Sequence, residues 1–251
     1  MDPITLLIVC PLVFLAMLVD AIAGGGGLIS LTAYLVAGLP PHVALGTNKV
    51  SSAIGTVVAT ARFAKSGLIK IKLAIPAVIF ALAGSAIGAK VALHTPDGVI
   101  QMIMVFALPV VAFFVLRKRA LDVPAATIST KKQIAIIAIS SFFIGMYDGF
   151  YGPGTGTFML LAFTAAAKLP VREANGEVKC ANLASNVAAL VTFAANGTVW
   201  WGLGLIASAF AIAGSYVGSG LVVKNGAKVV RPIMLVVLAL LFVKVLYDLV
   251  F

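Results

Sequence analysis

The sequence predicts an all-α polytopic membrane protein with about ten transmembrane helices, two of them short or broken, in two inverted repeats of five helices. Three observations predict this fold: the composition is strongly apolar, the chain contains two similar halves, and basic residues gather in alternate connections. Of the 251 residues, 62% are hydrophobic and 10% are charged, and the mean hydropathy is +1.14. Such a chain has too little polar surface to cover a water-soluble globule of that size.

Apolar runs long enough to cross about 30 Å of hydrocarbon as helices recur along the whole chain. They cover residues 3–23, 43–64, 73–93, 98–116, 133–151, 173–195, 200–222 and 229–250. Two shorter runs, 27–39 and 156–168, follow glycine-rich stretches. A helix of about 12 residues, rising 1.5 Å per residue, cannot complete a crossing. Each short run is therefore expected to combine a half-helix with extended backbone, crossing fully or re-entering beside a central cavity.

The second half of the chain repeats residues and motifs of the first at an almost constant spacing. An offset of 130 residues, or 128 around the first short run, relates Lys49 to Lys179, Asp20 to Asp148, Gly24 to Gly152, and AGSAIG (83–88) to AGSYVG (213–218). The change of offset implies a two-residue insertion in the second short run. The sequence therefore predicts an internal duplication.

We divide the chain into a first transmembrane repeat (1–116), a cytoplasmic linker (117–132) and a second transmembrane repeat (133–251). Whether the repeats are parallel or inverted depends on whether the short runs count as crossings. With five crossings in each half, the second repeat has the opposite orientation to the first. With four crossings, the two repeats have the same orientation.

The basic residues favour ten crossings. With the N-terminus outside, every Lys and Arg except Lys49, Lys90, Lys179 and Lys244 then lies on the cytoplasmic side, as the positive-inside rule requires. With eight crossings, the basic stretch KLPVR (168–172) is translocated instead. The net charge of +10 is thus a topology signal. We expect no nucleic-acid partner, because the bases are not interleaved with exposed aromatic residues.

Asp20 and Asp148 end long apolar runs just before the glycine-rich stretches. One interpretation makes each an interfacial charge or a cap on the following short helix. The other makes each an ion-coupling carboxylate that binds H+ or Na+, because charges at membrane depth are rare and usually functional. Glycines followed by a half-helix also present N–H groups and the positive end of a helix dipole, which suit an anion.

Polar residues surround the repeated Lys at the start of the third long run of each half. Taken singly, Lys49 or Lys179 is equally explained by snorkelling to an interface. Together with nearby hydroxyls and amides, however, these charges suit an oxyanion. The predicted substrate-binding residues are Gly24, Gly25, Gly26, Gly27, Thr47, Asn48, Lys49, Ser52, Gly152, Pro153, Gly154, Thr155, Lys179, Asn182, Ser185 and Asn186.

No catalytic residue, cofactor or metal site is expected. Cys10 and Cys180 lie inside apolar runs, and His42 and His94 lack carboxylate or cysteine partners at ligand spacing.

Five motifs carry a resemblance that covers nearly the whole chain. They are DAIAGGGGLIS (20–30), GLPPHVALGTNK (38–49), YDGFYGPGTGTF (147–158), KCANLASN (179–186) and GAKVVRPIM (226–234). Through them the chain resembles the sulfite exporter TauE/SafE family of membrane transporters, and more particularly its YfcA-like branch. The resemblance implies a secondary transporter of the bacterial inner membrane and a family associated with sulfite, sulfonates and related sulfur oxyanions. Many relatives place a Pro in the first short helix, where Thr32 stands here.

The expected function is secondary active transport of a small anion, coupled to H+ or Na+, by a non-enzymatic protein of the lipid bilayer. Both a monomer and a homo-oligomer remain open. A passive anion channel is the first alternative, because the same basic, glycine-lined cavity would serve it. An intramembrane aspartyl protease is the second alternative. Tyr147 and Asp148 match one protease motif, but the second motif, Gly-x-Gly-Asp, is absent.

Overall fold

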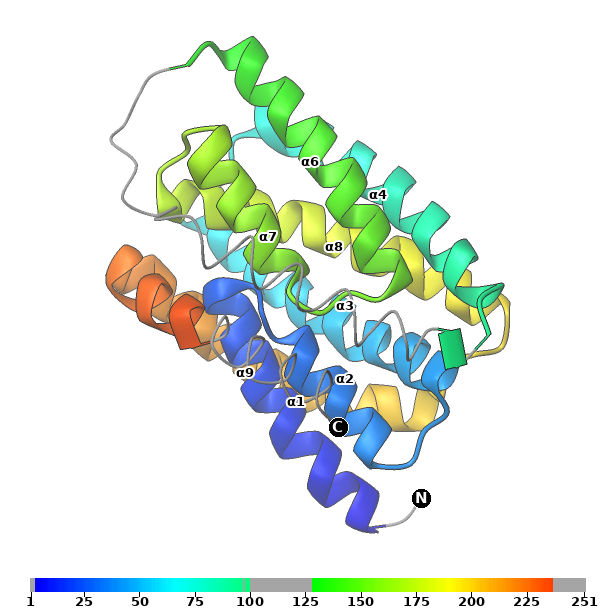
Figure 1. Ribbon diagram of the computed structural model, residues 1–251. Coiled ribbons are helices and arrows are strands. Elements are labelled where there is room, and N and C mark those ends of the chain that lie inside the picture. The colour runs from blue at the N-terminus through cyan, green and yellow to red at the C-terminus, as the bar shows by residue number, and fades with distance from the viewer. Residues whose placement is uncertain (1–2, 97, 100–127, 237–251) are drawn as a thin grey trace.

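The computed structural model describes residues 3–96, 98–99 and 128–236 (Figure 1), and within these residues the secondary structure is helical. The helices are α1 (Pro3–Ala23), α2 (Gly27–Val36), α3 (Pro41–Lys65), α4 (Ile71–Leu93), α6 (Thr130–Phe150), α7 (Thr155–Leu161) with the π-helix η1 (Ala162–Ala166), α8 (Val171–Ala195) and α9 (Trp201–Asn225). A further helix is described over 227–236. Most of the runs expected at 98–116 and 229–250, and most of the linker, lie outside the described residues.

Five of the described helices, α1, α4, α6, α8 and α9, are long and apolar enough to cross a membrane. Their ends lie close to the ends of the apolar runs in the sequence. α6 begins at Thr130, before the apolar run expected from 133, because the Ser129 side chain accepts a hydrogen bond from the backbone N–H of Lys132 and caps the helix. These helices are consistent with the predicted multi-pass membrane protein.

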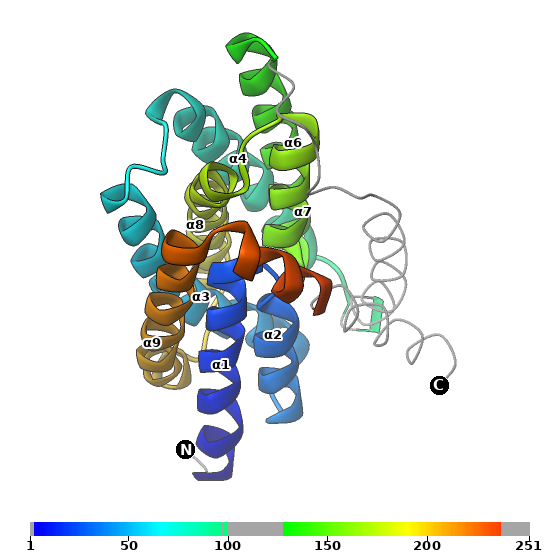
Figure 2. The same cartoon turned by 90° about the vertical axis from the view of Figure 1, so that its left-hand side faces the viewer.

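α3 and α8 lie in the middle of the molecule, between two outer pairs of helices (Figures 1 and 2). On one side α4 packs against α6, and on the other α1 packs against α9. Each outer pair joins a helix of the first half to a helix of the second. α2 turns back along α1, while α7 packs against α6 and α8. The two halves therefore share one core and do not form separate units.

Glycines allow the outer pairs to approach closely. A Cβ atom on Gly84 of α4 would lie only 2.1 Å from the backbone oxygen of Phe142 on α6. At the corresponding place in the other pair, a Cβ on Gly214 of α9 would lie 2.2 Å from the backbone oxygen of Phe14 on α1. Small residues at such positions let helix backbones touch, which is how membrane helices gain packing energy.

The starts of α4 and α9 show the same correspondence. The Thr47 hydroxyl on α3 accepts a hydrogen bond from the backbone N–H of Trp200 at the start of α9, at 2.9 Å. The Glu177 carboxylate on α8 accepts one from the backbone N–H of Lys70 at the start of α4, at 2.6 Å. Residues related by the offset of 130 thus make equivalent contacts across the molecule, which supports the internal duplication.

The two short runs form broken helices of unequal construction. α2 has ten residues, whereas the second run begins as the seven-residue α7 and continues as η1. In η1 the backbone N–H of Ala167 donates to the oxygen of Ala162, five residues earlier, at 3.1 Å. α7 and η1 together have 12 residues, two more than α2, which matches the two-residue insertion that the change of offset implies.

The glycine contacts can be tested with adjacent substitutions on α4. Gly84→Leu forces a side chain into the backbone of Phe142 and should lower stability by at least about 1–3 kcal/mol, the usual cost of overpacking. Ala83→Leu, at the preceding exposed position, should leave stability unchanged. Thermal unfolding in detergent measures both variants, and equal midpoints for the two would contradict the close packing of α4 on α6.

Candidate functional site

Two loops, one before each broken helix, meet in the middle of the molecule. Gly24 in the first loop and Gly152 in the second have positive φ angles of 79° and 99°, which glycine adopts without strain. A Cβ on Gly24 would lie 2.2 Å from the carbonyl carbon of Gly156, so the first loop is in backbone contact with the first turn of α7. Thr157 fixes this contact: its N–H donates to the Gly24 oxygen at 3.2 Å and its hydroxyl to the Ala23 oxygen at 2.8 Å.

Both broken helices begin at a small cavity between the two halves. It is lined by residues of both loops and of α1, α2, α3, α6, α7 and α8, namely Met17, Asp20, Gly24, Gly27, Asn48, Lys49, Ser52, Asp148, Gly152, Thr155, Gly156, Asn182 and Asn186. The cavity volume is about 20 Å³. That space admits a water molecule, whereas an anion of several atoms requires side chains to move.

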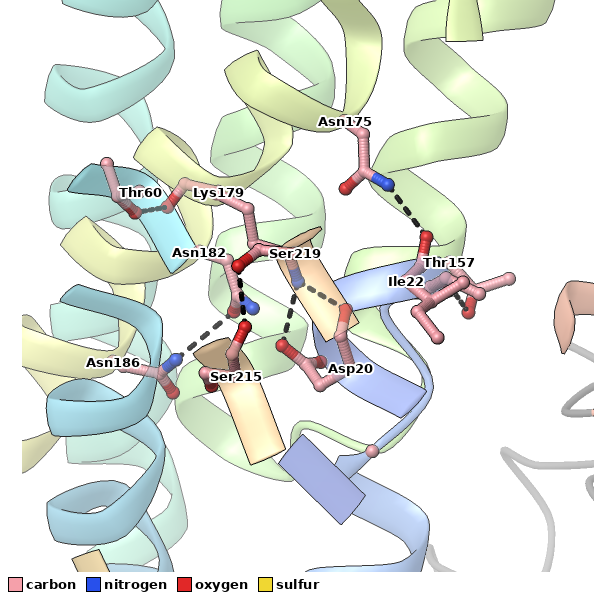
Figure 3. Close-up of polar contacts among 12 residues, drawn as sticks. Asp20, Ile22, Thr60, Thr157, Asn175, Lys179, Asn182, Asn186, Ser215 and Ser219 are labelled. Atoms are coloured by element: carbon pink, nitrogen blue, oxygen red, sulfur yellow. Dashed lines mark hydrogen bonds and ion pairs between the residues drawn. The ribbon is translucent and has the colours of Figure 1, made fainter. Parts of the chain in front are cut away.

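The first of two buried ion pairs joins α8 to α1 (Figure 3). Lys179 Nζ lies 2.8 Å from Asp20 Oδ2 and also donates to the Asp20 backbone oxygen at 2.5 Å. The Lys179 side chain is completely buried. On the same helix, the Asn175 amide donates to the backbone oxygen of Ile22 at 2.7 Å. The end of α1, just before its glycines, is therefore fastened to α8.

The second buried pair joins α3 to α6. Lys49 Nζ lies 2.9 Å from Asp148 Oδ2 and donates to Asn186 Oδ1 at 3.1 Å. The Ser185 hydroxyl donates to the same carboxylate oxygen of Asp148. The Asn186 amide nitrogen in turn donates to Asn182 Oδ1 at 3.3 Å. This pair is thus the centre of a polar network that faces the cavity.

The two pairs are crossed: each joins a Lys of one half to an Asp of the other. Burying a charge costs several kcal/mol, and an oppositely charged partner with good geometry offsets that cost. Both repeated Lys are buried, so the snorkelling interpretation is wrong. The capping interpretation of the Asp residues is wrong as well. Gly26 and Gly154 precede α2 and α7, neither helix start has a side-chain cap, and the carboxylates bind Lys instead.

The two carboxylates contact different Lys residues, and no contact between Asp20 and Asp148 occurs among the described residues. An aspartyl protease requires two carboxylates close enough to share a proton. The crossed pairs therefore give no support to that alternative. Within the described chain no cluster of three His, Cys, Asp or Glu residues suits a metal ion.

Many of the residues predicted from the sequence converge on the cavity. Both predicted ion-coupling residues line it, as do the predicted substrate-binding residues Gly24, Gly27, Asn48, Lys49, Ser52, Gly152, Thr155, Asn182 and Asn186. Their roles in binding and coupling stay predictions. Met17 and Gly156, which are not among the predicted binding residues, also line the cavity. Met17 lies one helical turn before Asp20 on the same face of α1, so helical spacing from Asp20 could have identified it as a cavity residue.

The remaining predicted residues lie beside the cavity or elsewhere. Lys179 binds the Asp20 carboxylate, and Ser185 binds the Asp148 carboxylate. The Pro153 oxygen accepts a hydrogen bond from the Tyr147 hydroxyl at 2.7 Å. Thr47 binds the start of α9.

The other two predicted residues of the first loop, and the glycine before α7, shape the backbone. Gly25 accepts from the Leu28 N–H at 3.4 Å, and Gly154, with a φ of 82°, precedes α7. A Cβ on Gly26 would lie 2.1 Å from the backbone oxygen of Ala16. Gly26 therefore packs α2 against α1, and a larger residue there disrupts the fold before it can fill the cavity.

Comparison with known proteins agrees with this architecture. The sequence profile of the family described as "Sulfite exporter TauE/SafE" matches residues 9–245. The chain belongs to the TauE/SafE family. It is a membrane transporter of that family and a multi-pass bacterial membrane protein. No solved structure matches it.

This TauE/SafE transporter aligns with several relatives over almost the whole length of both chains. A "Probable membrane transporter protein ORF9" from Sinorhizobium sp. is 36% identical over 94% of this chain and 90% of its own. The "Probable membrane transporter protein YfcA" of Escherichia coli K12 is 31% identical over 94% and 89%. A "Probable membrane transporter protein" of Haemophilus influenzae is 30% identical over 94% and 92%. These names support transport and suggest no enzymatic activity.

The Lys179 pair can be tested by removing one charge or both. Lys179→Met leaves the Asp20 carboxylate buried without its counter-ion and should lower stability by about 3–5 kcal/mol. The double variant Lys179→Met/Asp20→Asn removes both charges and should recover a large part of that loss. Thermal unfolding in detergent measures the three proteins. A double variant less stable than Lys179→Met would show that the two charges do not compensate each other.

Proposed function

We propose that the chain is a secondary active transporter that moves a small anion, a sulfur oxyanion or an organosulfonate, across the cytoplasmic membrane, coupled to H+ or Na+. The observation that carries this proposal is the cavity where both broken helices begin, lined by the Lys49 ammonium and by amides and hydroxyls. Such groups bind oxyanions through charge-assisted and neutral hydrogen bonds. The positive end of the α2 dipole at Gly27 adds to the attraction.

The charge balance of the cavity favours coupled transport over passive flow. Lys49, Lys179, Asp20 and Asp148 together carry no net charge. An anion that enters alone therefore leaves this buried site with one negative charge that no described group balances, and a buried uncompensated charge is costly. A cation bound with the anion restores neutrality. Transport of the two ions together follows from this balance.

Sulfite and sulfonates are the first substrates to test. The description of the family names sulfite, and sulfonates share its pyramidal group of three oxygens on sulfur. Lys49, Asn48 and Ser52, which all line the cavity from α3, offer three hydrogen-bond donors to such a group.

We further propose ten membrane crossings, with the second repeat inverted relative to the first. α2 runs back along α1, so the first short run returns toward the side of the molecule where α1 begins (Figure 2). The crossed pairs and the equivalent helix starts at Lys70 and Trp200 relate the halves by the sequence offset. The distribution of Lys and Arg supplies the orientation.

The transport proposal is tested by uptake into proteoliposomes. The wild-type protein should accumulate radiolabelled sulfite or ethanesulfonate above the external concentration when a proton or sodium gradient is imposed, and dissipating the gradient should abolish accumulation. Uptake that only equilibrates under every gradient would indicate a channel. The absence of uptake and of ligand-induced stabilisation with every sulfur oxyanion and sulfonate tested would contradict the proposed substrate class.

The place of the site is tested with Gly27→Ala. A Cβ there would meet no atom closer than Pro153 Cα at 3.4 Å, so the fold tolerates it, and the methyl group is added to a residue that lines the cavity. We expect about tenfold weaker substrate binding, corresponding to about 1.4 kcal/mol, with unchanged thermal stability. Gly98→Ala is the matched control, because a Cβ there meets nothing within 4 Å. Equal binding by both variants would place the substrate elsewhere.

The inverted topology is tested with Ser66→Cys and Asn196→Cys. These exposed positions lie at corresponding turns, α3–α4 and α8–α9, in a background where the buried Cys10 and Cys180 are replaced by Ala. A membrane-impermeant thiol reagent added to intact cells should label Asn196→Cys at once and Ser66→Cys only after lysis. Labelling of both from the same side would show that the repeats are parallel.

A further inference from the structure

We infer that the two crossed ion pairs have different functions. The Lys49–Asp148 pair opens in each transport cycle: the driving cation, H+ or Na+, binds the Asp148 carboxylate, and the substrate anion then replaces that carboxylate on Lys49. The Lys179–Asp20 pair stays closed and holds the end of α1 in place. This inference rests on the proposed function and specifies how the same site couples the two ions.

The surroundings of the two Lys residues differ although their positions correspond. Lys49 lines the cavity, whereas Lys179 does not and is completely buried. Lys179 binds two oxygens of a single residue, the backbone and carboxylate oxygens of Asp20, so opening its pair also detaches the backbone before the glycine loop. Lys49 has no such backbone contact among the described residues. Its partners are the side chains of Asp148 and Asn186, which can exchange without unfolding a helix end.

The polar residues of the cavity gather around the Lys49 pair. The amides of Asn48, Asn182 and Asn186 line the cavity. Asn48 is 94% buried, its Oδ1 atom has no hydrogen-bond partner, and neither end of its amide is bound to another described residue. An amide left unpaired in a buried place costs free energy. An anion beside Lys49 can accept a hydrogen bond from Asn48 Nδ2, whereas the unpartnered Oδ1 is an acceptor that suits a donor or a cation such as sodium.

Exchange at Lys49 explains why the two ions must move together. With Asp148 ionised and paired, an anion near Lys49 meets a carboxylate of the same sign at close range, in a site where charges are poorly screened. A proton or a sodium ion on Asp148 removes that repulsion and releases the ammonium. The Ser185 hydroxyl, which donates to the ionised carboxylate, can rotate to accept a hydrogen bond from the protonated form or to offer its oxygen to sodium.

The groups that face Asp148 come from four elements. Lys49 on α3 and Ser185 on α8 contact the carboxylate, and Tyr147 lies next to it on α6 with its hydroxyl bound to the Pro153 oxygen. Asp20 on α1 lines the same cavity, with its charge balanced by Lys179. Asp148 is therefore the carboxylate whose partner Lys also lines the cavity and can take up the anion.

The test compares Asp148→Asn with Asp20→Asn, the same change at the corresponding position. The probe is ethanesulfonate, because a sulfonate keeps its charge between pH 5 and 9, and binding is measured by ligand-induced thermal stabilisation of purified full-length protein. For the wild-type protein we expect the Kd to fall up to tenfold per pH unit of acidification if H+ is the driving ion. If Na+ is the driving ion, the Kd should fall up to tenfold per tenfold rise in sodium. In Asp148→Asn the Kd should depend on neither, and in Asp20→Asn the dependence should remain.

Cation dependence that persists in Asp148→Asn, or that disappears in Asp20→Asn alone, overturns the inference while leaving the proposed function intact. Binding of ethanesulfonate, sulfite and sulfate to none of the proteins, wild type included, contradicts the proposed function itself. If a single variant does not fold, the double variants decide. Lys179→Met/Asp20→Asn should retain cation-dependent binding, whereas Lys49→Met/Asp148→Asn should lose anion binding, and the reverse result overturns the inference.

Discussion

The crossed pairing of two Lys with two Asp is the interaction on which the rest of the site depends. Each of these charges is buried, and among the described residues none has a counter-ion within its own half. Lys49 needs Asp148, and Lys179 needs Asp20. Because leaving a buried charge unpaired costs more than most single packing contacts provide, neither half can place its charges without the other. The pairs therefore fix how the halves face each other, and the cavity is the space left between them.

The glycines are what bring these charges into register. Gly84 and Gly214 let α4 and α9 touch α6 and α1, which carry the two Asp. At the ends of α1 and α6, the positive φ angles of Gly24 and Gly152 turn the chain back immediately after each carboxylate. Bulkier residues at Gly84 and Gly214 would separate the helices. Close packing and broken helices are thus parts of one arrangement.

Much of this architecture is predictable from the sequence. The apolar runs predict the described long helices to within a few residues, because hydrocarbon thickness sets their length. The repeated motifs identify the central charges. The partners of those charges are not predictable in this way, since an internal alignment pairs residues that are equivalent, such as Lys49 with Lys179, whereas the contacts join residues that are not. For the same reason, the sequence predicts that the Lys residues bind the anion and that the Asp residues bind the driving ion. The structure instead places each Lys in an ion pair with an Asp.

Helical periodicity explains which of the predicted polar residues line the cavity. Asn48 and Ser52 are four residues apart and lie on the cavity face of α3, as do Asn182 and Asn186 on α8. Thr47 is one position away and reaches the start of α9 instead. A sorting of the polar residues by helix face would have separated Thr47 from Asn48, although both lie beside Lys49 in the sequence. Gly26 illustrates a different limit, because its contact with Ala16 arises only once α2 has turned back along α1.

The two halves of the chain have unequal shares of the site. The offset of 130 relates Asn186 to Thr56 and Asn182 to Ser52, so the second half supplies amides where the first supplies hydroxyls. It also relates Ser185, which binds the Asp148 carboxylate, to Gly55, which has no side chain to offer Asp20. The cavity is thus asymmetric, and among the described residues the ammonium group that lines it belongs to Lys49. Because its buried charges balance when it is empty, an anion and a cation can occupy this cavity together at a lower electrostatic cost than either ion alone.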